Sequence, residues 1–234
     1  MSSPQFALVP SSYPAADPLT FNVNNSTLLR KMFEPFAAAV ETTNSPKWYG
    51  GCQLTDLLAS STDATSRDFL LWTANITTTQ ETTATGNITT TTTTITRANG
   101  SWITDGWQVG DIASIFTAVG VAAVAGTEGL LAAISAVTAT VLTFTVVGGA
   151  WSAATAPAGC RVCKMHQRYR FTVPLNSGNA AAVANFSVLN GANDNSLLRT
   201  EMSLGATEML VIQPVAAISA LPASVSFKAQ LKRY

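Results

Sequence analysis

Residues 225–231 read Val-Ser-Phe-Lys-Ala-Gln-Leu, so apolar and polar side chains alternate along the whole stretch. This two-residue period is the pattern of a β-strand that buries one face and exposes the other. The same period appears at 169–173, which ends at Pro174, and at 139–147, which ends at Gly148-Gly149. Because proline and paired glycines interrupt strands and favour turns, these stretches predict a fold of short β-strands.

Other segments fit the same architecture. Residues 69–73 and 209–214 are apolar runs typical of buried strands, and residues 19–23 alternate. Short strands that recur about every 10 to 15 residues, with turn signals between them, are typical of sandwiches and barrels. Residues 28–40 leave two alternatives open: a helix, which Pro35 would interrupt, or a strand followed by a loop and a short helical turn.

Threonine content changes sharply along the chain. Between Thr73 and Thr96, 14 of 24 residues are threonine and none is lysine or arginine. Threonine favours extended backbone because its branched side chain is stiff, although such a run can also be a flexible polar linker. Because Ile88 and Ile95 provide little apolar surface, we expect much of this run to be exposed edge or loop.

The residues before and after the threonine-rich part resemble each other in composition and differ from that part. We therefore predict an all-β protein with a β-sandwich or jelly-roll-like outer domain, interrupted by an inserted small β-barrel or β-sandwich module. The outer domain comprises residues 1–74, with an extended proline-rich arm at 1–18, and residues 164–234. The inserted threonine-rich module comprises residues 75–163.

Charge is scarce and balanced. The 234 residues include 13 Lys and Arg and 13 Asp and Glu, and only 11% are charged, against about 25% in an average protein. With 47% hydrophobic residues, such a chain stays soluble most easily when much of its surface meets other subunits. A neutral chain also lacks the basic footprint of a nucleic-acid-binding protein, so we expect no nucleic-acid partner.

Residues 129–151 carry no charge over 23 positions, a length that could span a bilayer. Threonines at strand-like spacing interrupt the stretch, and no basic cluster flanks it. We interpret it as a buried pair of strands and expect no membrane partner. Residues 1–5 lack the features of a secretory signal, and three cysteines form an odd set, which argues against a secreted disulfide framework.

A search for catalytic constellations fails. The chain has one histidine, His166, so metal motifs with two histidines are impossible. It has no Gly-x-Ser-x-Gly elbow and no phosphate-binding Gly-x-x-x-x-Gly-Lys loop. No two carboxylates lie in a sequence context that predicts a raised pKa for one and a lowered pKa for the other. We therefore predict that the protein is not an enzyme and has no cofactor.

One cluster of soft ligands stands out. Cys160, Cys163 and His166 follow each other at three-residue spacing, and Cys52 could complete a tetrahedral zinc site. A disulfide or a redox dithiol is a second possibility, although no βαβ pattern surrounds the cysteines. A single Cys-x-x-Cys without a second pair is common, so we favour the interpretation that these are small packing residues and that no metal is bound.

Two sets of residues are candidates for contacts with partners. Four basic residues lie at and after the end of the threonine-rich module and could face a negatively charged partner, or line a solvated strand face: Arg161, Lys164, Arg168 and Arg170. Five tryptophans could form a sugar-binding platform, although core packing or subunit contact is the commoner role, and Trp102 and Trp107 are those we assign to an interaction surface.

The module carries a family resemblance. Residues 105–112 read DGWQVGDI and residues 136–144 read AVTATVLTF. These stretches resemble a small β module of structural proteins in tailed bacteriophages, found in tail tube subunits and as an insertion in other virion proteins. The chain departs from that pattern between the two halves, where residues 126–129 (GTEG) replace the usual Asn-Asn-Gly turn.

The outer region is similar to small β-sandwich virion proteins of the head-decoration or cement type. The matching stretches are residues 28–33, 57–68, 173–179 and 204–210. The resemblance implies a virion structural protein, most closely a capsid decoration subunit on the head surface, made in the host cytoplasm. Its implied partners are sister copies, for example in a trimer, and other virion proteins such as the major capsid protein. A tail tube or baseplate protein is the alternative, followed by a carbohydrate-binding adhesin.

Overall fold

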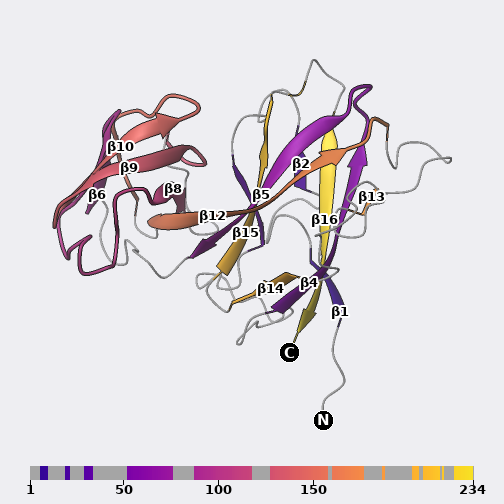
Figure 1. Ribbon diagram of the computed structural model, residues 1–234, viewed down its shortest axis with the longest axis horizontal. Helices are drawn as coiled ribbons and strands as arrows, with labels where there is room; N and C mark the ends of the chain where they lie inside the picture. The colour runs from indigo at the N-terminus through magenta and orange to yellow at the C-terminus, as the bar shows by residue number, and fades with distance from the viewer. Residues whose placement is uncertain are drawn as a thin grey trace, which may run out of the picture. The chain divides into compact units, whose positions relative to one another are not determined.

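The computed structural model describes residues 6–9, 19–21, 29–33, 52–75, 87–117, 127–157, 160–176, 186–187, 202–205, 208–216, 218 and 224–233. Within these ranges every regular element is a β-strand, which confirms the predicted all-β fold (Figure 1). The strands are β1 (Phe6–Val9), β2 (Leu19–Phe21), β3 (Arg30–Phe33), β4 (Cys52–Ser61), β5 (Arg67–Asn75), β6 (Ile88–Thr90), β7 (Thr94–Arg97), β8 (Ile112–Thr117), β9 (Leu131–Val137), β10 (Val141–Val147), β11 (Ala154–Thr155), β12 (Cys160–Val173), β13 (Phe186–Ser187), β14 (Met202–Leu204), β15 (Glu208–Pro214) and β16 (Val225–Arg233).

The described residues form two compact units. The first, the sandwich unit, contains the described residues up to Thr73 and those from Gln167 onward. The second, the insert unit, contains the described residues from Ala74 to His166. The chain therefore enters the insert unit within β5 and leaves it within β12. The described residues of the insert unit overlap the range 75–163 that the sequence assigns to the inserted module.

The sandwich unit contains two sheets. In one, the strand order is β1-β16-β4-β13, with β2 also paired to β16 and β14 to β4. Strand β16 contains the alternating stretch 225–231 and pairs antiparallel with β4 from Val225↔Ser61 to Arg233↔Cys52. The other sheet of this unit places the C-terminal half of β12, β5, β15 and β3 in that order.

The two sheets face each other across one apolar core. Strands β4, β14 and β16 contribute to it from one sheet, and β5, β12 and β15 from the other. At its centre the ring centroid of Phe69 lies 4.9 Å from that of Phe227, in a T-shaped contact, and 5.9 Å from that of Phe171, in a stacked one. Phe227 also meets Phe171 edge to face at 6.0 Å. Since Phe227 lies on one sheet and the other two rings on the facing sheet, this triad joins the layers.

The insert unit is a single antiparallel sheet in the order β11-β6-β7-β10-β9-β8, followed by the first half of β12. One face of this sheet carries the unit's core, whose side chains are at most 3% exposed: Ile88, Ile95, Trp102, Trp107, Ala113, Ile115, Ile134, Leu142, Phe144 and Trp151. Residue Ser135 forms a bulge, because Thr143 pairs with Ala136 and the next residue, Phe144, pairs with Ile134. Its hydroxyl donates to the Thr143 carbonyl at 3.2 Å.

The uncharged stretch 129–151 contains β9 and β10, the pair of strands that the threonine spacing predicted. Among the residues that the structure describes, no helix has the length and apolar character needed to cross a membrane.

Two expectations need correction. The helical alternative for 28–40 is wrong at Arg30–Phe33, which form β3 in antiparallel pairing with β15; residues 34–40 lie outside the described part. The threonine-rich run was expected to add little to the core, yet Ile88 and Ile95 are 2% and 0% exposed. The reason is the hairpin of β6 and β7, whose alternation turns both isoleucines inward.

We predict that Phe227→Ala destabilises the sandwich unit by about 3–5 kcal/mol, because it removes a fully buried ring and leaves a cavity between the sheets. Urea denaturation followed by tryptophan fluorescence measures the change. Leu175→Ala is the matched control, since that leucine is 50% exposed and its truncation leaves no cavity. Equal effects of the two substitutions would show that Phe227 is not at the centre of the core.

Candidate functional site

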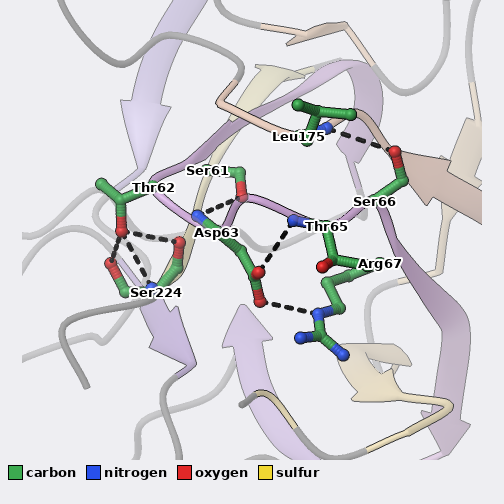
Figure 2. Close-up of polar contacts among 8 residues, drawn as sticks. All are labelled: Ser61, Thr62, Asp63, Thr65, Ser66, Arg67, Leu175 and Ser224. Carbon is green, nitrogen blue, oxygen red and sulfur yellow. Dashed lines mark hydrogen bonds and ion pairs between the residues drawn. The ribbon is translucent and has the colours of Figure 1, made fainter. Parts of the chain in front are cut away.

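The turn between β4 and β5 carries a cluster of polar side chains centred on Asp63 (Figure 2). Asp63 is only 2% exposed. One of its carboxylate oxygens accepts from the Thr65 backbone N–H at 2.9 Å, and the other from Arg67 Nε at 2.6 Å. Its own backbone N–H donates to the Ser61 hydroxyl at 3.1 Å. A buried carboxylate is costly unless it is paired, and these contacts satisfy it.

The same turn is bonded to two distant segments of the sandwich unit. Thr62 N–H donates to the Ser224 carbonyl at 2.9 Å, and Ser224 N–H donates back to the Thr62 hydroxyl at 2.9 Å, next to the start of β16. At the end of β12, Leu175 N–H donates to the Ser66 hydroxyl at 3.3 Å (Figure 2). The backbone N–H of Asn176, a residue with a left-handed φ of 50°, donates to the Asp63 carbonyl at 3.0 Å. We call this set the polar clasp.

The charges of the clasp favour an ionised Asp63. Burial by itself raises the pKa of Asp63, but the hydrogen bonds from Arg67 and from the Thr65 N–H, together with the positive charge of Arg67, outweigh it and hold the pKa below its ordinary value. The clasp is thus a fixed ion pair inside a turn, and its hydroxyls are engaged with backbone groups.

Arg168 and Arg170, two of the basic residues predicted to contact a partner, lie on β12 in the sandwich unit and form ion pairs with other residues of the chain. Arg168 Nε donates to the Thr73 hydroxyl at 2.9 Å, and its Nη2 lies 3.0 Å from Glu208 Oε1. Arg170 lies 2.7 Å from Asp68, which also accepts from the Thr172 hydroxyl at 2.6 Å. The hydrogen bonds from Thr172 and Arg170 lower the pKa of Asp68, against the opposing effect of burial.

Lys164 belongs to the insert unit, where it closes the loop between β7 and β8. Its Nζ donates to the Gly106 carbonyl at 2.6 Å, lies 2.8 Å from Asp111 Oδ2, and sits 5.3 Å from the Trp107 ring centroid. Arg97 acts similarly on the other side of the loop, since it pairs with Asp105 and its guanidinium lies 4.7 Å from the Trp102 ring centroid.

The two tryptophans of this loop are core residues. Trp102 and Trp107 are 0% and 3% exposed and meet edge to face at 5.8 Å. Their backbones are joined by a Trp107 N–H bond to the Trp102 carbonyl at 3.0 Å. We call this arrangement the tryptophan corner. The assignment of both residues to an exposed interaction surface is therefore wrong, because burial of the rings holds the loop onto the sheet.

The tryptophan corner also accounts for the motif at 105–111. Gly106 and Gly110 have φ values of 81° and 93°, a region that glycine adopts without steric cost. Gly110 N–H donates to the Ile134 carbonyl at 2.8 Å, and Ile134 N–H to the Asp111 carbonyl at 2.9 Å. Gln108 N–H donates to the Asp111 carboxylate at 2.8 Å. Gly106, Gly110 and Asp111 thus build the loop and attach it to β9.

Two of the other three tryptophans are also buried. Trp72 is 7% exposed and donates to Gln213 at 3.1 Å, and Trp151 is 3% exposed and lies 4.6 Å from Phe144 between ring centroids. Trp48 lies outside the described residues. Four buried rings leave no sugar-binding platform among them.

The cysteine and histidine cluster falls on one extended strand, β12. Cys160 and Cys163 are buried and in no disulfide, whereas His166 is exposed. In a strand, residues three apart point to opposite faces and lie about 10 Å from each other, too far to share a metal ion. Among the described residues, no group of three or more His, Cys, Asp or Glu could hold a metal. Cys52 begins β4, and its side chain lies outside the described part.

Arg161 differs from the other basic candidates because it is 5% exposed, on a stretch of β12 paired with β8. Burial lowers the pKa of its guanidinium, with the Cys163 thiol nearby acting in the opposite direction. Of the four basic residues assigned to a partner surface, Arg161 is thus inside the unit, and the other three form ion pairs within the chain.

Sequence reasoning missed the polar clasp. The signal for it was the run Ser60–Asp68, SSTDATSRD, in which serine, threonine and aspartate cluster between two apolar strands. Such residues hydrogen-bond nearby backbone groups and so favour turns. What the run could not reveal is that its partners lie at residues 175, 176 and 224, more than a hundred positions away.

Comparison of the chain with protein-family models, with curated proteins and with solved structures finds no match in any of the three.

The clasp predicts a characteristic acid sensitivity. Since the pKa values of Asp63 and Asp68 are lowered on folding, both carboxylates stabilise the fold above their unfolded value of about 3.9, and this contribution is lost as the pH falls through the lowered values. We expect the unfolding free energy to drop below about pH 4. In Asp63→Asn the drop is shallower, and stability at pH 7 is lower by about 1–3 kcal/mol.

Urea midpoints measured between pH 2.5 and 7 test this pH dependence, with Asp105→Asn as a control for an aspartate that belongs to the insert unit. An acid profile of Asp63→Asn that overlays the unmodified protein would contradict the role given to the clasp.

Proposed function

We propose that the chain is a structural protein of a tailed bacteriophage particle, and most closely a capsid decoration or cement protein that binds the head shell and sister subunits. The observation that carries this proposal is the tryptophan corner. The stretch that resembles phage virion modules, DGWQVGD, builds a rigid loop held by buried rings and ion pairs. Its residues serve architecture, which is what an assembly module requires.

In the described residues, the polar groups of the clasp serve the fold. The buried carboxylate Asp63 is neutralised by Arg67 within the clasp. The only histidine is exposed on β12, and Cys160 and Cys163 are buried in the insert unit. Hydroxyls of Thr62 and Ser66 bond backbone groups. A general base next to an activated nucleophile, the usual sign of covalent catalysis, is therefore missing from the clasp.

The rigidity of the scaffold also suits a protein that binds by shape. Preorganised surfaces lose little conformational entropy when they associate. The loop of the tryptophan corner exposes Ile103 and Val109, which are 60% and 67% exposed although its backbone is fixed by hydrogen bonds. Exposed apolar side chains on a fixed loop are suited to contact with a neighbouring protein.

A tail role is the second candidate, because the module at 105–144 resembles tube subunits as well. A tube protein forms rings that stack, whereas a decoration protein adds to preformed heads. The adhesin alternative loses its main support, since four of the five tryptophans are buried in the described structure.

Binding to separated particle parts tests the proposal. Purified chain is mixed with heads, and separately with tails, of the phage that encodes it, and the mixtures are sedimented. We expect the chain to sediment with the heads and to be visible on their surface by electron microscopy. Stacked rings formed by the chain alone would favour the tail role. Sedimentation with neither part, by protein shown to be folded, would contradict both.

A further inference from the structure

The insert unit has a sheet face made of threonine, alanine and valine, with threonine the commonest. Along β6, β7 and β10, buried side chains such as Ile88, Ile95 and Leu142 alternate with partly exposed ones on the opposite face. The residues of that opposite face are Thr89, Thr94, Thr96, Ala133, Ala136, Val141, Thr143 and Thr145. We call it the threonine face.

The register places these side chains in contiguous rows. Thr89 pairs with Thr96, which pairs with Val141. In the next row Thr94 pairs with Thr143, which pairs with Ala136 across the bulge. Neighbouring strands lie about 4.7–4.9 Å apart, and same-face residues along a strand about 6.8 Å apart, so the rows form a regular grid of small side chains.

No charge interrupts this grid. Strands β6, β7, β9 and β10 contain one charged residue, Arg97, and its guanidinium lies over the buried Trp102 ring. Ordinary solvated surfaces are about 25–35% charged. Depletion of charge is instead the compositional mark of the centre of a protein–protein interface.

We propose that the threonine face is the surface through which two copies of this chain pair. A two-fold contact brings the same patch of each copy together, so it requires a self-complementary surface. Threonine meets this requirement because its hydroxyl both donates and accepts, and its methyl packs against another methyl. An uncharged face also opposes its copy without repulsion.

The chemistry of the face selects a second copy over a charged partner. A phosphate backbone or a charged protein surface would lose hydration on this face and meet no opposite charge there. Two such faces can stack about 10 Å apart, as sheets do in a sandwich, with threonine and valine methyls interdigitating. This inference rests on the proposed function in one respect: it assigns a surface to the contact between sister copies.

Sedimentation velocity of the full-length chain over a range of concentrations tests the proposal. We expect a dimer whose dissociation constant rises about tenfold or more in Thr143→Lys, because the substitution places two desolvated charges in the interface. Thr145→Lys, at an exposed position of the same face, gives a second variant if Thr143→Lys fails to fold. Thr104→Lys is the matched control, since Thr104 is exposed in the loop of the tryptophan corner, outside the threonine face.

The possible outcomes separate this inference from the proposed function. A chain that is monomeric throughout, or a dimer that both face variants leave unchanged, overturns the inference. A monomeric chain whose face variants lose binding to phage heads assigns the face to another protein, and also overturns it. A dimer that the face variants dissociate but that binds no particle part supports the inference while contradicting the proposed function.

Discussion

The sandwich unit depends on one contact between its sheets, that of Phe227 with Phe69 and Phe171. Phe227 comes from β16, the strand that pairs along its full length with β4, so the ring fixes the position of one whole sheet against the other. The polar clasp adds a second constraint at the edge of the core: Asp63 and its neighbours tie the β4–β5 turn to the start of β16 and the end of β12. Apolar packing supplies the stability, and the clasp specifies which segments meet.

The insert unit also combines an apolar core with polar contacts at its edge, but it uses different residues. Its sheet has one buried face, and the tryptophan corner completes that core by folding a loop onto it, with Arg97 and Lys164 over the rings. Most of the charged side chains that the structure describes form internal pairs of this kind. Strands β6, β7, β9 and β10 carry no charge on their outer face, and that contrast is why we assign contact between copies to the threonine face.

The strands could be predicted from sequence because alternation is a local property. Residues 225–231 and 139–147 show it directly; the first stretch lies in β16, and the second contains β10, which begins at Val141. The placement of Ile88, Ile95 and Trp102 could not be predicted in the same way, since their burial depends on which strands and loops cover them. The Cys160–His166 spacing is ambiguous for a related reason: the same three-residue spacing that suits a turn around a metal separates the side chains when the backbone is extended. The clasp was hidden because its partners are distant in sequence.

We propose that this chain is a component of a phage particle, and most closely of its head. Immunogold labelling of intact particles, with an antibody shown to bind the folded chain, tests it most directly. We predict gold distributed over the heads. Gold confined to the tails would replace the decoration role with a tail role, and complete particles that carry no label, confirmed by mass spectrometry to lack the chain, would contradict the account.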